Sequence, residues 1–206
     1  MRRILDWDTA FFGCRIARLD PEDLAAAESA STEAWLREQR VACAYLLVAL
    51  DDQAGLDRAR GHGFRLIDAR VTLEATGAPP AEAVSTAGIR PAAAGDTETL
   101  KAIARHGPRD VRFHVDGNFG DERCDEFYDA WIANSCAGWA DRVFVADDSD
   151  GPKGYVTVHR RADKGEIGLV GVSADARGRG VASRLLGTAR QWCAEQGLAR
   201  VSVVTQ

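Results

Sequence analysis

The chain has 206 residues, which is enough for one large domain or two modest ones. Its 46% apolar and 28% charged residues are ordinary for a globular protein and exclude a disordered or fibrous chain. The formal net charge of −5 disfavours nucleic acid as a partner, although it leaves room for a local basic pocket.

Three further features bear on where the protein works. The longest apolar run, Ala42–Leu50, is about half as long as a membrane-spanning helix must be. Met1-Arg2-Arg3 leads into Asp6 and Asp8 instead of an apolar segment, so no secretory signal is indicated. The five cysteines are odd in number, scattered and without a CxxC pair, which favours reduced thiols over disulfides or a zinc site. We therefore expect a cytoplasmic protein with no membrane span and no metal.

Residues 1–75 predict a small α/β domain. Alternation over Arg15–Leu19 suggests a strand, and Pro21 stands at a position that favours the start of a helix. The expected elements are a strand or hairpin within Ile4–Leu19, a helix from Pro21 to about Arg40, a strand over Ala44–Leu50, a helix over Asp51–Gly61 and a strand over Arg65–Leu73.

A stretch rich in Ala, Gly, Pro and Ser/Thr, residues 76–88, predicts a linker to a second domain over 89–206. Polar, glycine-containing Gly107–Asp121 shows no clear period, and Asp163-Lys164-Gly165 predicts a hairpin turn. The expected elements are a strand from Ile89, helices over Thr97–His106 and Glu122–Cys136, strands over Arg142–Ala146, Gly154–Arg160 and Glu166–Val172, a helix from Val181 to Gln196 and a last strand over Ala199–Thr205.

The segment with the most chemical information joins a strand to a helix through a loop with Gly178 and Gly180. Glycine lets the backbone turn tightly and approach a ligand closely. The unpaired amides of the first helical turn and the positive end of the helix dipole then face the same place. This combination predicts a site for a diphosphate.

The spacing of the loop distinguishes between diphosphate sites. The dinucleotide pattern G-x-G-x-x-G fails because Ser183 stands where the third glycine is needed, and no Walker loop is present. Arg177-x-x-Gly180-x-Ala182 resembles the R/Q-x-x-G-x-G/A signature of the GNAT superfamily of N-acetyltransferases. The resemblance covers Ile89–Gln206 and implies an α/β fold with a mixed sheet, in which the small α/β domain precedes the GNAT domain.

The resemblance also implies acetyl-CoA as co-substrate. No metal is expected, because His62, His106 and His159 form no ligand spacing with the scattered cysteines. In the family, the strand matched by Ile167–Val172 splays from its neighbour, and its backbone pairs with the pantetheine. The implied coenzyme-binding residues are Val170, Gly171, Val172, Arg177, Gly178, Arg179, Gly180, Val181 and Ala182. The side chains of the two arginines either add positive charge or are simply solvated.

Leu5–Gly13, Val111–Asp116 and Phe127–Ile132 resemble bacterial members of the superfamily in which a small α/β domain precedes the GNAT domain. Those enzymes acetylate the amine of a nucleotide-linked 4-amino-4,6-dideoxyhexose. Gly55–Leu73 also resembles a degenerate copy of a GNAT carboxyl-terminal half, with a scaffold role.

The irregular polar segment Arg109–Asp121 is the expected acceptor site, because long polar loops beside a sheet often bind substrate. The alternative is a surface loop with one buried aromatic residue. The expected acceptor residues are Arg112, Phe113, His114, Asp116 and Phe119, with Asn118 beside them.

Glu166 lies eleven residues before Arg177, a spacing at which some members of the family carry a glutamate base. The alternative is a solvent-facing glutamate beside Lys164. The family's general-acid tyrosine follows the fifth strand, and the sequence stops at Gln206 before that position, so we expect a chain cut short there, with its fifth-strand edge exposed.

The predicted reaction is direct transfer of an acetyl group from acetyl-CoA to a small-molecule amine, most specifically a nucleotide-linked amino sugar. A protein or another small amine is an alternative acceptor, and a non-catalytic acyl-CoA-binding module is an alternative function. A homodimer is left open.

Overall fold

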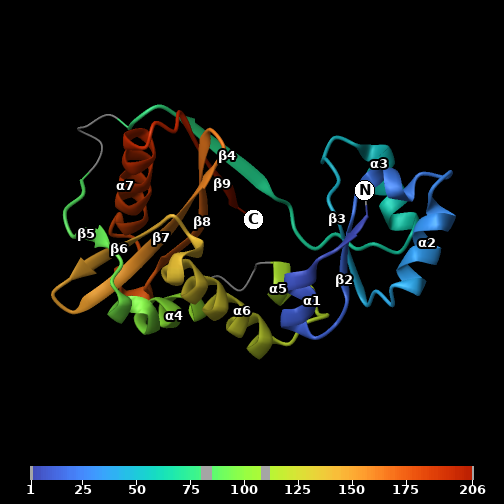
Figure 1. The fold of residues 1–206 in the computed structure, drawn as a ribbon, viewed down its shortest axis with the longest axis horizontal. Coiled ribbons are helices and arrows are strands. Elements are labelled where there is room, and N and C mark those ends of the chain that lie inside the picture. The colour runs from blue at the N-terminus through green and yellow to red at the C-terminus, as the bar shows by residue number, and fades with distance from the viewer. Residues whose placement is uncertain (1, 80–84, 108–111, 206) are drawn as a thin grey trace. The chain divides into compact units, whose positions relative to one another are not determined.

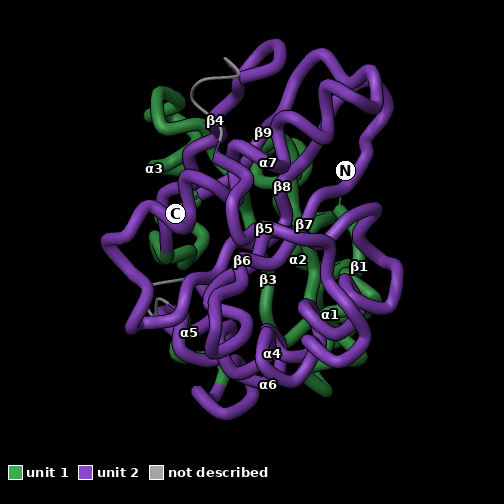
Figure 2. Tube along the Cα trace, turned by 90° about the vertical axis from the view of Figure 1, so that its left-hand side faces the viewer, with its two compact units in different colours: residues 1–67, 116–119 green, residues 68–115, 120–206 purple. Residues whose placement is uncertain are grey.

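The computed structural model describes residues 2–79, 85–107 and 112–205. The chain divides into two compact units. Unit 1 contains residues 1–67 and 116–119, and unit 2 contains residues 68–115 and 120–206 (Figure 2). Residues 80–84 of the predicted linker and residues 108–111 of the polar stretch Gly107–Asp121 lie outside the described residues.

Unit 1 is a three-stranded sheet with helices packed on it. Strand β2 (Ile16–Leu19) lies in the centre, antiparallel to β1 (Arg3–Ile4) and parallel to β3 (Cys43–Leu46). The helices are α1 (Asp6–Phe12), α2 (Ser29–Glu38) and α3 (Gln53–Gly61), shown in Figure 1. The small core contains Leu19, Leu24 and Ala59, with Trp35 and Phe64 against them. The predicted small α/β unit is therefore present.

Two elements of unit 1 differ from their prediction. Asp6–Phe12 forms helix α1 where a strand or hairpin was expected, and the helix expected from Pro21 to Arg40 is interrupted. A short 3₁₀ turn, Pro21–Leu24, ends at Ala25, whose ψ of 150° is extended. The predicted helix is therefore interrupted at Ala25, where the backbone is extended, and α2 starts four residues later.

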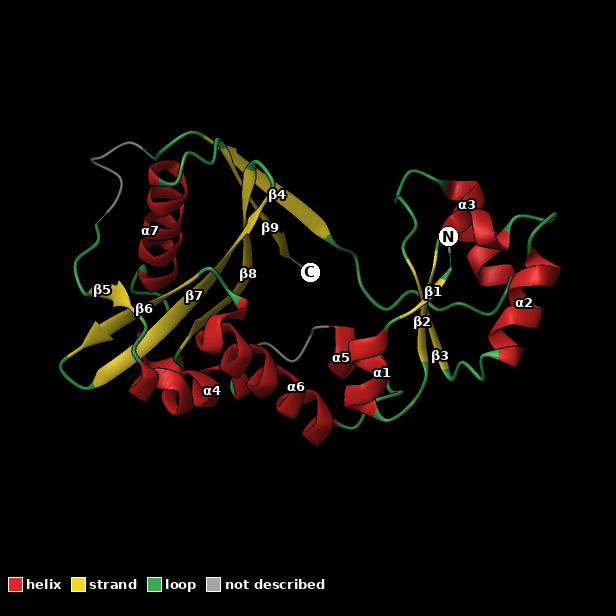
Figure 3. Ribbon diagram, viewed as in Figure 1, coloured by secondary structure: helices red, strands yellow, loops and turns green. Residues whose placement is uncertain are grey.

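Unit 2 has a six-stranded mixed sheet in the order β4-β9-β8-β7-β6-β5 (Figures 1 and 3). Only the pair β8–β9 is parallel, and all other neighbouring strands are antiparallel. The strands are β4 (Val71–Thr76), β5 (Ile89–Pro91), β6 (Arg142–Asp148), β7 (Gly151–Arg161), β8 (Lys164–Val172) and β9 (Arg200–Thr205). The expected mixed α/β fold class is confirmed. The hairpin between β7 and β8 turns at residues 162–163, slightly earlier than predicted.

Strand β4 changes the predicted organisation of the chain. The sequence suggested a strand over Arg65–Leu73 within the first domain, but Val71–Thr76 pairs with β9 in the sheet of unit 2. The pairing runs from Val71 opposite Thr205 to Thr76 opposite Arg200. This strand satisfies backbone groups along the edge of β9 that the sequence led us to expect exposed. The structure accordingly divides the chain after residue 67, whereas we predicted a division after residue 75.

Helices cover both faces of the unit 2 sheet (Figure 3). Helix α7 (Val181–Glu195) packs Leu185 and Ala189 on Val156, Val158 and other strand residues. On the opposite face lie α4 (Thr97–Arg105) and α6 (Asp121–Asn134), followed by a π-helical turn over Ser135–Trp139. These helices lie within about two residues of the sequence prediction, since their apolar periodicity is strong.

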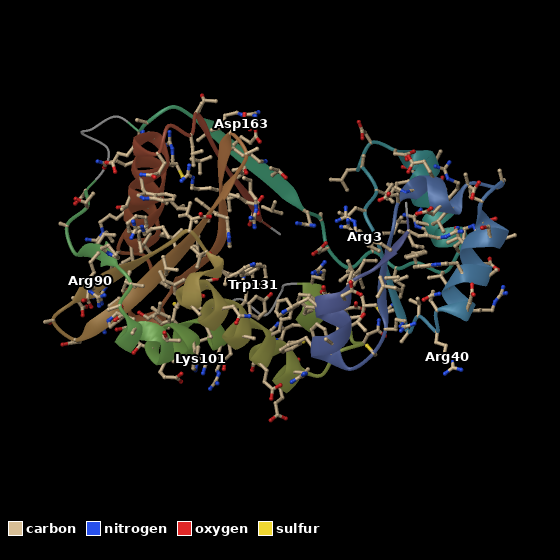
Figure 4. All side chains as sticks on the ribbon, viewed as in Figure 1. Arg3, Arg40, Arg90, Lys101, Trp131 and Asp163 are labelled. Atoms are coloured by element: carbon tan, nitrogen blue, oxygen red, sulfur yellow. The ribbon has the colours of Figure 1, made fainter. Side chains whose placement is uncertain are left out.

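Ion pairs of Arg90 tie strand β5 to β6 and to the start of helix α4. Arg90, labelled in Figure 4, donates to Asp96 at 2.6 Å and to Asp147 on β6 at 2.7 Å. Both hydrogen bonds are charge-assisted, and they lower the pKa of Asp96 and raise that of Arg90. None of the described helices combines the length and apolar character that a bilayer crossing requires.

Candidate active site

Strands β8 and β9 separate part-way along their length. They pair from Lys164 opposite Arg200 to Ile167 opposite Val203, and no β8–β9 pairing follows among the described residues. Beyond that point β8 stays paired with β7, while β9 pairs on its other side with β4. We call this point the fork. Residues 168–172 of β8 therefore offer one edge of backbone groups to a ligand.

A register shift in β7 accompanies the fork. The pairing with β8 slips between Val156 and Val158, and the hydroxyl of Thr157 accepts a hydrogen bond from the amide of Leu169 at 2.8 Å. Gly171 lies close above the ring of Tyr155, since a Cβ at this position would stand 2.5 Å from the ring. Gly171 therefore lets the strand pass over a buried tyrosine.

The glycine loop follows β8 directly. Gly178 and Gly180 have φ angles of 74° and 73°, the left-handed region that suits glycine, and Gly180 caps α7. Apart from the adjoining residues, no atom of the described part of the chain lies within 4 Å of a Cβ placed on either glycine. The loop borders a depression of about 350 Å³. Its lining residues are Val172, Ala176, Arg177, Gly178, Gly180, Val181, Ala182 and Ser183. Amides at the start of α7 lack helical partners, so the depression suits an anion.

Arg177 is engaged by protein carbonyls. Its Nε donates to the carbonyl oxygen of Val172 at 3.2 Å, and a terminal nitrogen donates to that of His106 at 2.8 Å. The side chain thus ties the end of β8 and the end of α4 to the glycine loop. Arg179 is exposed and is not among the residues that line the depression.

The predicted coenzyme residues fall into two adjoining groups. Val170 and Gly171 lie on the free edge of β8, and Val170 is 38% exposed. Val172 is shared, because it ends β8 and lines the depression. Arg177, Gly178, Gly180, Val181 and Ala182 line the depression with it. The structure therefore brings all of the predicted set except Arg179 into one continuous path.

The five predicted acceptor residues are divided between the two units. Arg112, Phe113 and His114 lie on the short helix α5 (Arg112–Val115) in unit 2, whereas Asp116 and Phe119 belong to unit 1.

The side chains of the predicted acceptor residues contact other residues of the chain. Phe113 packs on Phe127 at 4.4 Å between ring centroids, and Phe119 packs on Phe12 at 4.3 Å. Both rings are buried, so neither presents the open face that stacking on a base or sugar needs. Asp116 accepts from Asn118 at 2.8 Å.

Arg112 and His114 are partly buried. The guanidinium of Arg112 lies over the Phe113 ring at 4.3 Å. His114 contacts Asp125 at 3.1 Å.

Glu166 lies beside the fork and is partly buried. It stands opposite His159 on β7 and opposite Ser202 on β9. Paired residues of neighbouring strands share one face of a sheet, and this is the face away from α7. Sequence reasoning missed His159 and Thr157. The signal that could have found them is the alternation of Tyr155, Thr157 and His159 with the valines at 156 and 158.

Two tyrosines of unit 2 are poor proton donors. Burial raises the pKa of Tyr128 to about 12 and raises that of Tyr155 further still. Among the described residues, no cluster of His, Cys, Asp or Glu side chains is arranged to hold a metal ion.

Comparison with known proteins places these features in context. Residues 109–206 match the Acetyltransferase (GNAT) family. The dTDP-fucosamine acetyltransferase of Escherichia coli O6:H1 is 28% identical over 207 residues, which cover 98% of this chain and 84% of that protein.

Solved structures agree in fold. A GCN5-related N-acetyltransferase from Sphaerobacter thermophilus superposes with a TM-score of 0.65 at 17% identity, over 99% of this chain. The chain spans 66% of the length of that protein, slightly under two thirds. A functionally unknown conserved protein from Staphylococcus epidermidis has a TM-score of 0.57 at 13% identity, over 93% of this chain and 73% of its own.

Proposed function

The chain has an N-acetyltransferase domain of the GNAT family, and on this premise we propose that it moves an acetyl group from acetyl-CoA to the amine of a nucleotide-linked amino sugar. The observation that carries the proposal is one continuous path, from the free edge of β8 into the glycine-lined depression before α7. An extended pantetheine fits an unpaired strand edge, and a diphosphate fits the start of a helix.

Positioning supplies most of the catalysis in this proposal. Holding an amine against a thioester contributes about 7–11 kcal/mol to the lowering of the barrier. Removing the amine's proton costs about 1.4 kcal/mol for each pKa unit above the working pH. Backbone amides of Val170, Gly171 and Val172 are candidates to polarise the thioester carbonyl. Glu166, beside the fork, is placed to assist the deprotonation.

The acceptor class is supported by the relative's name and by Arg112. The relative, 84% of which is covered by the match, is a dTDP-fucosamine acetyltransferase. A nucleotide sugar carries phosphates that an arginine recognises. Arg112 lies on α5, on the same unit as the fork. A protein amine or another small amine remains the alternative acceptor.

A direct assay tests this proposal. The protein is incubated with acetyl-CoA and dTDP-4-amino-4,6-dideoxygalactose, and release of the coenzyme thiol is followed together with the mass of the sugar product. We expect one acetyl group on the sugar nitrogen for each thiol released. The matched control is dTDP-glucose, which has the nucleotide but no amine. Thiol release with polyamines or peptides only would move the acceptor to the alternative class, and no release with any amine would contradict acetyl transfer.

Arg112→Ala should raise the KM for the nucleotide sugar about tenfold and leave acetyl-CoA affinity unchanged. The reason is that one charge-assisted contact to a phosphate contributes about 1.5–3 kcal/mol. Steady-state kinetics and calorimetry provide the two readouts. Lys101→Ala is the control, since Lys101 is a cation of the same unit that pairs with Glu98 on α4. A weaker affinity for acetyl-CoA with an unchanged sugar KM would show that Arg112 serves the coenzyme instead.

A further inference from the structure

We infer that His159 is the proton acceptor for the amine in this reaction, with Glu166 facing it across the β7–β8 pair. The inference rests on the proposed function and adds a residue to it. The sequence offered only Glu166 for this task, and His159 is brought to the fork by strand pairing.

Two observations define the position of His159. His159 lies opposite Glu166 of β8. Glu166 in turn comes one residue before Ile167, the last residue of β8 that pairs with β9. A Cβ on Gly168, the first residue of the free edge, would stand 2.8 Å from the Nε2 atom of His159. The imidazole therefore lies directly against the start of the backbone edge that is proposed to hold the coenzyme, and glycine at 168 leaves room for it.

The ring has an unused nitrogen. His159 is 2% exposed, and its buried Nδ1 has no hydrogen-bond partner in the part of the chain that the structure describes. A buried polar nitrogen of this kind is uncommon in native proteins and calls for an explanation such as a ligand or a catalytic role. Thr157, its neighbour on the same face, is by contrast bonded to the Leu169 amide.

Charged groups around the ring act in both directions. Burial, the main cause, lowers the pKa of His159, and Arg161 on β7 lowers it further. Three groups raise the pKa and so oppose this decrease: the negative charges of Glu166 on β8 and of Asp141 before β6, and a hydrogen bond with the backbone of Trp139. Because the pKa lies below its ordinary value near 6.5, the imidazole is neutral at pH 7 and ready to accept a proton. The Glu166 carboxylate then stabilises the imidazolium that forms.

The side chain of Trp139 covers the imidazole ring on the face of the sheet where α4 and α6 pack. The indole of Trp139 meets the imidazole edge to face, with 5.1 Å between the centroids and 68° between the planes. Trp139 is itself 54% exposed, so it is the outer of the two rings. Trp131 on α6, labelled in Figure 4, follows at 6.1 Å from Trp139. The imidazole is therefore shielded by the exposed indole of Trp139, which ends the π-helical turn after α6.

The proposed step balances in protons and electrons. The ammonium of the acceptor gives one proton, through one water molecule, to the buried Nδ1 of His159 and becomes a free amine. Its lone pair forms the C–N bond to the thioester carbonyl carbon, and the C–S bond breaks with its electron pair on sulfur. The amine's second proton neutralises that thiolate, and His159 returns its proton to water.

The first test is the pH dependence of kcat/KM. His159→Gln should lower kcat/KM by about 10²-fold at pH 7, the lower end of the range for general base catalysis, and should remove the decline that the wild type shows at acid pH. Affinity for acetyl-CoA should stay unchanged. His62→Gln is the matched control, because His62 lies in unit 1 and contacts Glu33. An acid decline that persists in His159→Gln would overturn the inference.

A second test needs no acceptor and keeps His159 in place. The imidazole signals of the four histidines are titrated by nuclear magnetic resonance, and the signal missing from His159→Gln is assigned to His159. In Glu166→Gln its midpoint should move to lower pH by at least ~0.5, since the opposing carboxylate charge is gone. An unmoved midpoint would overturn the pairing of the two residues. This outcome is distinct from a wild type that transfers no acetyl group, which contradicts the proposed function itself.

Discussion

Replacing Gly180 by valine is expected to weaken acetyl-CoA binding by at least ~100-fold, which calorimetry will measure as loss of detectable heat. Gly180 has a φ of 73°, where a β-branched residue is strained by about 1–2 kcal/mol. The Cβ of the new side chain would also project into space that no described residue beyond the adjoining ones occupies. In the proposed complex that space belongs to the diphosphate.

Gly197→Val is the matched control for this experiment. Gly197 has a φ of 74° just beyond the other end of α7, and a Cβ there would likewise have no described residue within 4 Å apart from the adjoining ones. The backbone strain is therefore the same, but the site lies at the opposite end of the helix. We expect Gly197→Val to lose stability and keep its affinity for acetyl-CoA. Equal affinities in the two variants would remove the glycine loop from the binding site.

Leu185→Ala is expected to lower the free energy of unfolding of unit 2 by about 3–5 kcal/mol. Leu185 is fully buried on α7, where it packs in the same core as Val156 and Val158 of β7. Truncation leaves a cavity that the rigid sheet cannot close, so a transfer cost and a cavity cost add. Urea denaturation followed by fluorescence measures the change.

Leu73→Ala provides the comparison within the same unit. Leu73 lies on β4 and is 55% exposed, so its truncation should cost no more than about 1 kcal/mol. Similar losses in both variants would mean that α7 does not pack on the sheet as described. In that case the start of α7, and the anion site with it, would be placed wrongly.

Most elements of unit 2 were predictable because their signals are local. The apolar stripe of α7 and the alternation of β6–β8 place the core residues without any knowledge of their partners. Helix α1 and the break at Ala25 were missed for a related reason. Short segments such as Asp6–Phe12 contain too few turns for a period to stand out.

The path proposed for the coenzyme was predictable in part. Gly178 and Gly180 stand in a recognisable spacing, and the structure places both around the depression with Arg177. The role of the Arg177 side chain was not predictable, because its partners are carbonyls of Val172 and His106. The acceptor residues were grouped by their closeness in sequence, although the two units divide them.

By itself, the sequence determined the class of fold, the glycine loop and the helix that follows it, since each depends on neighbouring residues. Only the tertiary structure decided that β4 joins β9, that β8 and β9 separate after Ile167, and that His159 faces Glu166. These outcomes depend on the register between segments distant in sequence. Register is set by hydrogen bonding and packing across the whole sheet, and a shift of one residue would turn each side chain to the other face.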